Sequence, residues 1–215
     1  MQKQYPSRRN EARSVDAIHV RMVAAVALVR PAEPDDAARL GRVHVETWRA
    51  TYRGLLSDEY LDALSDIRQA AFWSRVLDDD DHVGRAHVAE DADAGVVGFC
   101  DCGPERGGAP SWGKIMAIYI LPDWQRQGLG RRLVGASGNH LTAEGFESLV
   151  VWALEDNPAR AFYSALGGES AEKRRLNIGG VDVSEQCFRW PSIAGDLKAE
   201  GPEPGVAPAK GLSRH

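Results

Sequence analysis

The sequence predicts one α/β domain with a mixed sheet of the α+β type, with elements in the order β-α-α-β-β-β-α-β-α-β-β. Three observations support this prediction. Short apolar runs of strand length alternate with segments of helical periodicity. Two pairs of runs are joined by turns typical of hairpins, and one apolar run leads through glycines into a helix. A chain of 215 residues suits a single domain.

The first part of the chain predicts a strand followed by helices. Residues 23–30 are apolar and predict the first strand. Pro34 and the two acids after it suit the first turn of a helix, because proline fits there and acids complement the helix dipole. Ser57 and Ser65 are each placed to cap a further helix. The core-facing positions of the first helix recur at helical spacing, at Leu40, Val43, His44, Thr47 and Trp48.

The rest of the folded part predicts six strands and two helices. The turn DADAG at residues 91–95 and the pair Gly179-Gly180 indicate the two hairpins, since glycine accommodates the backbone of a tight turn. The predicted elements are strands at 87–90, 96–102 and 114–121, a helix at 128–144, a strand at 149–154, a helix at 158–166 and a hairpin over 171–190.

The folded domain is predicted to span residues 23–191, between two extensions. Residues 1–22 lack the apolar core of a secretory signal, and Glu11 and Asp16 argue against an import presequence. We therefore expect a flexible extension on a cytoplasmic protein, with Met22 as an alternative start. Residues 192–215 have no periodicity and little to bury, which predicts a disordered tail.

Composition argues against several classes of protein. A formal net charge of −5 disfavours a nucleic-acid binder with a broad basic surface. No apolar run approaches the length of a membrane span. Cys100 and Cys102 are too close in sequence for a zinc knuckle and have no accompanying His cluster, so no metal site is expected. Together with Cys187 they are expected to be buried thiols in a reducing compartment.

The most informative segment joins the apolar strand at 114–121 to the next helix. Gln125, Gly128 and Gly130 lie where this helix begins. A helix N-terminus presents unpaired N–H groups and partial positive charge, which suit phosphate, and glycines leave room for it. The segment therefore predicts a pyrophosphate cradle, and the alternative is an ordinary glycine turn with surface arginines. Positive charge comes from Arg126, Arg131 and Arg132.

These residues resemble the acetyl-CoA motif of the GNAT superfamily of N-acetyltransferases, Q-x-x-G-x-G after an apolar strand. A second stretch, NPARAFYSALGG at residues 157–168, resembles the next motif of that family, in which a tyrosine follows six residues after an asparagine. The resemblance covers about residues 28–190. It implies the GNAT-like acyl-CoA N-acyltransferase fold and transfer of an acetyl group from acetyl-CoA to a primary amine, of a small molecule or a protein N-terminus.

The resemblance also implies a role for each matching residue. Asn157 would contact the pantetheine arm, and Tyr163 would protonate the departing sulfur of CoA. The backbone groups that would hold the pantetheine, in a gap between two splayed parallel strands, belong to Ile118, Tyr119 and Ile120. The N–H groups that would bind the pyrophosphate belong to Arg126, Gln127, Gly128, Leu129, Gly130 and Arg131.

Elementary chemistry supports the role of Tyr163, with a structural alternative. A phenol with a reference pKa of about 10 can protonate a thiolate whose acid has a pKa of about 8.5. Because Phe162 and Tyr163 lie on an apolar helix face, Tyr163 is alternatively a core aromatic. Asn157 is also suited to cap a helix with Pro158 in its first turn.

The general base is left open by the sequence. Many relatives carry an acid early in the strand before the glycine motif, where this chain has Lys114. Glu155, Asp101 and His87 are candidates, as is a relay through water. Direct attack by the amine is expected, because no cysteine falls on a motif position.

The acceptor side is indicated by the run W-x-x-T-Y-x-G, which resembles many small bacterial members of the family. Within it, Trp48 and Tyr52 are candidates to contact the acceptor, or alternatively core residues. The last hairpin offers an edge that a homodimer could use.

A catalytically inactive acyl-CoA-binding sensor is the main alternative function, and Lys114 in place of an acid supports it. A nucleotide-binding protein is disfavoured by the lack of G-K-[ST] and of dinucleotide-fold spacing.

Overall fold

The computed structural model describes residues 27–79 and 84–197. The predicted extension at 1–22 and most of the predicted tail lie outside the described residues. The strands are β1 (Leu28–Pro31), β2 (Arg85–Asp91), β3 (Gly95–Pro104), β4 (Trp112–Ile120), β5 (Ser148–Leu154), β6 (Glu169–Ile178) and β7 (Val181–Trp190). The helices are α1 (Ala37–Tyr52), α2 (Asp58–Asp62), α3 (Asp66–Leu77), α4 (Leu129–Ala143), α5 (Arg160–Ala165) and α6 (Ile193–Asp196), with 3-10 turns at Pro34–Asp36 and Pro122–Trp124.

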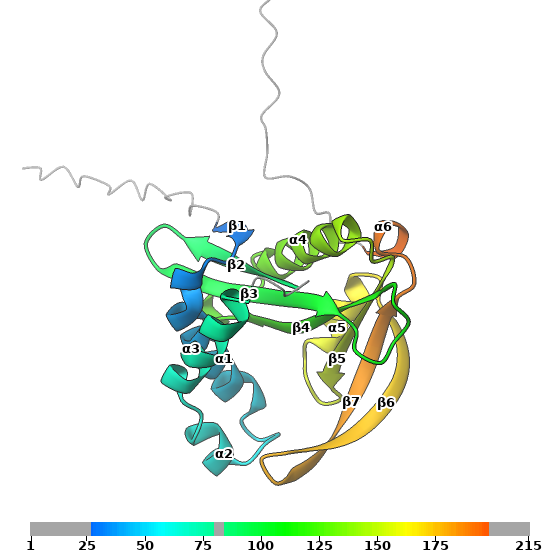
Figure 1. The fold of residues 1–215 in the computed structure, drawn as a ribbon. Helices are drawn as coiled ribbons and strands as arrows, with labels where there is room; N and C mark the ends of the chain where they lie inside the picture. The colour runs from blue at the N-terminus through cyan, green and yellow to red at the C-terminus, as the bar shows by residue number, and fades with distance from the viewer. Residues whose placement is uncertain (1–26, 80–83, 198–215) are drawn as a thin grey trace, which may run out of the picture.

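The predicted α/β architecture with a mixed sheet is confirmed. Seven strands form one sheet in the order β1-β2-β3-β4-β5-β7-β6, and all neighbours are antiparallel except β4 and β5. Helices α1 and α3 pack on one face of the sheet, while α4 and α5 pack on the other (Figure 1). Each face therefore has its own apolar core. Among the described residues, no helix has the length and apolar character needed to span a bilayer.

The parallel strands β4 and β5 separate after four residue pairs. Their pairing runs from Trp112 opposite Ser148 to Ile115 opposite Val151. On the other edge of β4, Cys102 pairs with Ile115 but Asp101 pairs with Ala117, so Met116 is an extra residue that forms a bulge. Beyond this bulge β4 continues along β3, whereas β5 continues along β7 to Leu154. The sheet therefore opens between the ends of β4 and β5.

Residues that the sequence predicts as helix caps and turn residues take these roles in the structure. The Ser57 Oγ accepts a hydrogen bond from the Tyr60 N–H at 3.2 Å, and the Ser65 Oγ accepts one from the Arg68 N–H at 3.3 Å. Gly179 and Gly180 have φ values of +57° and +84°, as the two central residues of a primed hairpin turn require. The caps and the second hairpin turn are therefore confirmed.

Some element boundaries differ from the sequence prediction. The first strand is described at Leu28–Pro31, and residues 23–26 of the predicted strand lie outside the described residues; α5 begins at Arg160 rather than at residue 158. The chain also continues past the predicted start of the tail at residue 192, because α6 forms there. Ile193 is buried, and its N–H donates to the Glu147 carbonyl at 2.8 Å. Leu197 also packs against this core. Two apolar residues in a polar stretch have no periodicity by which the sequence could have indicated this packing.

The close packing of α1 on α3 predicts a sensitive position. A Cβ added at Gly41 would lie 2.5 Å from the Ala70 backbone nitrogen and 2.7 Å from the Asp66 carbonyl oxygen. We expect Gly41→Val to lower the free energy of unfolding by about 2 kcal/mol or more, because backbone cannot yield easily to an overpacked side chain. Ala50→Val, at an exposed position of the same helix, should cost only about 0.5 kcal/mol. Urea unfolding of both variants measures the difference, and equal costs would contradict the close packing.

Candidate active site

The turn between β4 and α4 is held by its own side chains, which leaves backbone donors at the helix start. Gln125 donates from Nε2 to the Ile120 carbonyl at 2.9 Å, and Gln127 donates from Nε2 to the Asp123 carbonyl at 3.0 Å. Arg126 and Gly128 both have left-handed backbone, with φ of +62° and +81°. Gly128 is the N-cap of α4, and no side chain caps the helix. The first N–H groups of α4 are therefore available to an anion.

The two motif glycines serve different purposes. A Cβ on Gly128 would meet no atom within 4 Å, so this glycine faces open space at the helix start. A Cβ on Gly130 would lie 3.1 Å from the Phe162 ring of α5, so its lack of a side chain allows α4 to pack closely on α5. The expectation that both glycines clear space for a phosphate is therefore wrong for Gly130. Its backbone N–H stays a predicted contact.

Tyr163 lies on the α4 side of the sheet. Its side chain is buried and packs against Phe188 of β7, with ring centroids 5.5 Å apart. Burial raises the pKa of Tyr163, and the nearby Tyr52, Cys100 and Tyr119 add to the effect. The phenol is therefore kept protonated over the ordinary pH range. Ile118 and Ile120 pack against the same core.

Asn157 and Tyr52, far apart in the sequence, are brought together by a hydrogen bond. The Asn157 Nδ2 donates to the Tyr52 Oη at 3.3 Å, while its Oδ1 accepts from the Ala159 N–H at 2.8 Å. The predicted capping interaction is therefore present just before α5, although the regular helix begins later. The same side chain ties the end of α1 to the turn after β5.

Aromatic side chains gather on the α1 side of the opening. Trp48 lies 4.9 Å from Tyr52 and 6.4 Å from Tyr60 between ring centroids. His44 lies 4.8 Å from Tyr119, and burial lowers its pKa to about 4. The structure thus brings the predicted Trp48 and Tyr52 together with Tyr60, which no motif in the sequence identifies. The ring of Tyr119 faces this side, although sequence reasoning considered only its backbone.

The candidates for the base lie in different environments. Lys114 forms an ion pair with Glu105 at 3.1 Å, and Glu155 forms one with Lys173 that lowers the Glu155 pKa. His87 is buried on the α4 face, 6.2 Å from His140 between ring centroids, so it does not lie with the acceptor-side aromatics. Asp101 is also buried, on β3. The base therefore stays a prediction.

Glu185 of β7 is an acid near the opening that sequence reasoning missed. Its side chain is 14% exposed and pairs with Arg174 of β6 at 2.8 Å. Its charge contributes to the raised pKa of Tyr52, behind the larger effect of burial. Glu185 stands among several charged residues of the last hairpin, so no motif or spacing distinguishes it in the sequence.

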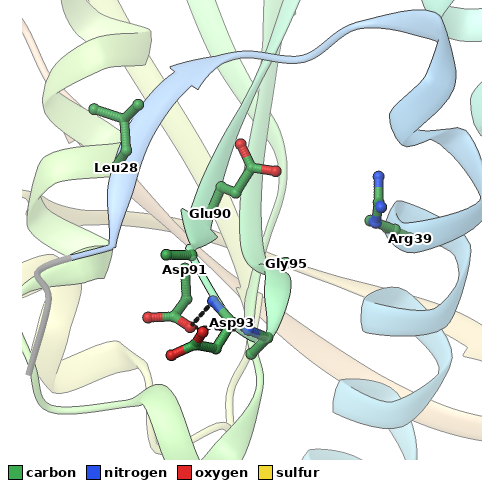
Figure 2. A pocket seen from close by; sticks show the side chains of 8 residues that line it. Leu28, Arg39, Glu90, Asp91, Asp93 and Gly95 are labelled. Carbon is green, nitrogen blue, oxygen red and sulfur yellow. Dashed lines mark hydrogen bonds between the residues drawn. The ribbon is translucent and has the colours of Figure 1, made fainter.

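A separate surface hollow lies away from this site. It has a volume of about 590 Å³, lies between β1, α1 and the β2–β3 turn, and is lined in part by Leu28, Arg39 and Glu90 (Figure 2). The Asp91 carboxylate there accepts the N–H groups of Asp93 and Ala94, both at 2.9 Å. These bonds shape the hairpin turn, and the hollow shares no residue with the opening between β4 and β5.

Comparisons with known proteins agree with the fold and the motifs. The family model of FR47-like proteins matches residues 108–176, which include both motifs. An uncharacterized N-acetyltransferase of Bacillus subtilis, YuaI, is 34% identical over 77% of this chain and 94% of the relative. The chain belongs to the GNAT superfamily of N-acetyltransferases. The predicted family and acyltransferase class are thereby confirmed.

Other relatives of this GNAT protein share parts of the chain or only its fold. A mycothiol acetyltransferase of Saccharomonospora viridis is 36% identical over 40% of this chain and 30% of its own length. A phosphinothricin acetyltransferase of Sinorhizobium meliloti, solved with acetyl-CoA, has a TM-score of 0.61 and 22% identity, covering 86% of this chain and 98% of the neighbour. A putative acetyltransferase from Salmonella typhimurium, solved with acetyl-CoA, has a TM-score of 0.59 and 16% identity, covering 85% and 100%.

The open position at Gly128 predicts a selective loss of donor binding. Gly128→Asp should weaken acetyl-CoA binding by roughly 100-fold or more, because negative charge replaces space for an anion whose charge-assisted hydrogen bonds are worth about 1.5–3 kcal/mol each. Aspartate tolerates left-handed backbone better than most residues, so the fold should survive. Gly145→Asp is the matched control, since Gly145 has φ of +88°, open space and a place at the other end of α4. Calorimetric titration of both variants gives the comparison, and similar affinities would argue against a phosphate at Gly128.

Burial of His87 predicts a contribution to acid sensitivity. Burial, with a smaller effect of His140, lowers the pKa of His87 to about 4, against about 6.5 in an unfolded chain. The unfolded state therefore binds more protons than the folded state between these two pH values. The contribution of His87 to the free energy of unfolding is fully present above pH 6.5 and is lost as the pH falls toward 4. His87→Leu should reduce the slope of unfolding free energy against pH in that window by up to about 1.4 kcal/mol per pH unit. Parallel curves for the two proteins would show that His87 does not titrate on unfolding.

Proposed function

We propose that this chain transfers the acetyl group of acetyl-CoA directly to a primary amine while both substrates are bound. The observation that carries the proposal is the opening between β4 and β5, with the uncapped start of α4 and the buried Tyr163 on one face of the sheet. Solved neighbours of the same fold include proteins in complex with CoA or acetyl-CoA. The amine belongs to a small molecule or to a protein N-terminus.

The donor would lie along the separated edge of β4. Beyond Ile115 the backbone groups of β4 that face β5 have no ladder partner among the described strands. Such groups require hydrogen bonds, and an extended pantetheine arm can supply them at Ile118, Tyr119 and Ile120. The pyrophosphate would contact the N–H groups from Arg126 to Arg131, at the helix start. Asn157 would contact the arm from the turn before α5.

In the reaction, the acceptor ammonium first loses a proton to solvent. The neutral amine nitrogen then attacks the thioester carbonyl carbon, and a C–N bond forms. The C–S bond of the resulting tetrahedral intermediate then breaks, Tyr163 gives its proton to the sulfur, and the excess proton on nitrogen leaves to solvent. Tyr163 regains a proton from solvent, which restores the phenol for the next turnover. Strand N–H groups near Ile118 would stabilise the oxyanion. Holding both substrates in place can lower the barrier by about 7–11 kcal/mol.

The cysteines support direct transfer rather than an acyl-enzyme. All three are buried, and burial raises the pKa of Cys100 well above its usual range. Burial likewise raises the pKa of Cys102 and of Cys187 to about 11. Because the thiolate is the nucleophilic form, such thiols are poorly suited to accept an acetyl group at neutral pH.

An inactive acyl-CoA-binding sensor is the second candidate. Lys114 favours it, because Lys114 occupies the position where many relatives carry an acid, and its ammonium is held in an ion pair with Glu105. The position of Tyr163 favours catalysis instead.

We further propose a cytoplasmic location and a homodimer that forms through the outer edge of β6, the last strand of the sheet. The absence of nucleic-acid and membrane partners is also proposed.

Calorimetric titration with acetyl-CoA, with ATP and NAD as controls, followed by assay of CoA release with a panel of amines, tests the proposal. Selective binding of acetyl-CoA and amine-dependent release of CoA would support transfer. Binding without release for any amine would favour the sensor. A folded protein that binds neither acetyl-CoA nor CoA would overturn both candidates.

The proposed acid predicts a specific kinetic defect. Tyr163→Phe should lower kcat by about 10²–10⁴-fold, the usual contribution of a positioned acid. The affinity for acetyl-CoA should change little, since the phenyl ring keeps its packing against Phe188. Single-turnover assays and calorimetry separate the two quantities. An unchanged kcat would remove Tyr163 from the mechanism.

A further inference from the structure

Glu185 lies on the sheet face opposite α4 and α5. It pairs with Leu154 of β5 on one side and with Arg174 of β6 on the other, and directly opposed residues share a face. The alternate residues Ala153 and Phe188 belong to the core beneath α4 and α5. The side chain of Glu185 is therefore on the other face, the one that α1 covers at β3 and β4.

A short chain of contacts connects Glu185 to the acceptor-side aromatics. The Asn157 N–H donates to the carbonyl of Leu154, the strand partner of Glu185, at 2.9 Å. The Asn157 side chain then donates to the Tyr52 Oη at 3.3 Å. The charge of Glu185 adds to the raised pKa of both Tyr52 and Tyr119, behind burial. The carboxylate thus lies beside the end of β5, near both phenols.

Aromatic side chains of α1 and α2 lie together with the tip of the last hairpin on this side. Trp48 stacks edge-on against Tyr52 and lies near Tyr60 of α2. The tip of the β6–β7 hairpin lies beside α2 (Figure 1), where a Cβ on Gly179 would fall 2.3 Å from the Tyr60 Cγ. An acceptor that approaches the opening from this face would therefore meet aromatic surface and one carboxylate.

The pairing of Glu185 with Arg174 leaves one carboxylate oxygen unengaged by that arginine. Both contacts, from Nε at 2.9 Å and from Nη2 at 2.8 Å, go to Oε2. Arg174 is itself fixed, because its guanidinium lies 4.2 Å above the centre of the Trp152 ring. Arg174 therefore orients the carboxylate while the Oε1 atom is left for another donor.

We propose that Glu185 recognises the acceptor: its Oε1 accepts a hydrogen bond from the acceptor ammonium, and the apolar part of the acceptor lies against Trp48, Tyr52 and Tyr60. This inference rests on the proposed function. It selects primary amines without a carboxylate on the neighbouring carbon, such as monoamines and peptide N-termini. A free amino acid would bring its own carboxylate beside Glu185, where like charges repel and Arg174 is already paired.

The test is calorimetric titration of the protein–CoA complex, which has no acetyl group to transfer, with three related amines. 2-Phenylethylamine and phenylalaninamide should bind, and phenylalanine should bind at least about 10-fold more weakly. Glu185→Gln should weaken binding of the first two by about 10- to 100-fold, as expected for one charge-assisted hydrogen bond. Phenylalanine should not lose affinity, because the variant frees Arg174 for its carboxylate.

Glu172→Gln is the matched control. Glu172 pairs with Arg189, so the control also removes one carboxylate from a strand-to-strand ion pair of the last hairpin. It should leave the three affinities unchanged. Affinity for CoA and the thermal midpoint check that both variants fold.

Three results would overturn the inference: no binding of any of these amines, binding that Glu185→Gln does not alter, or an equal loss for all three. Turnover of the same amines with acetyl-CoA tests the underlying function separately. If the unmodified protein and Glu185→Gln both transfer acetyl groups with the same preference for phenylalaninamide over phenylalanine, Glu185 has no role in recognition but the chain is a transferase. If amine binding depends on Glu185 but no amine is acetylated, the amine site is supported and the transfer reaction is contradicted.

Discussion

The candidate site depends on one extra residue in β4. Met116 bulges from the ladder with β3, and pairing of β4 with β5 stops at Ile115, the residue before it. A bulge bends its strand, and paired strands must stay about 4.8 Å apart. Past the bulge β4 keeps its pairing with β3 to Ile120, while β5 pairs with β7. A continuous sheet would have no unpaired edge for a donor and no passage between its faces.

The opening between β4 and β5 connects the two faces of the sheet, which carry different functional side chains. One face presents the uncapped start of α4 and the buried phenol of Tyr163. The other presents Trp48, Tyr52 and the carboxylate of Glu185. Asn157 connects them, because it precedes α5 on the first face and hydrogen-bonds Tyr52 on the second. This division suits a reaction in which the donor places its carbonyl carbon at the opening and the acceptor amine reaches that carbon from the opposite face of the sheet.

Most titratable groups around the opening are held neutral. Burial raises the pKa values of Tyr52, Tyr119 and Tyr163, and it lowers that of His44 to about 4. Burying a charge without a partner is costly, so such groups keep their neutral forms. Among these neutral groups Glu185 forms an ion pair with Arg174, whose guanidinium lies over the Trp152 ring. In the proposed acceptor site, this carboxylate beside neutral aromatic side chains would give a preference among amines that composition alone does not reveal.

The sequence by itself determined the features that act over a few residues. The caps at Ser57 and Ser65, the turn at Gly179-Gly180, and the strand-glycine-helix segment at Gly128 all depend on near neighbours, as does the hydrogen bond of Asn157 before α5. The tertiary structure alone decided the bulge at Met116, the packing role of Gly130 and the place of Glu185 on the same face of the sheet as α1. These depend on register between strands and on contacts between residues far apart in the sequence, for which a single sequence carries no local signal.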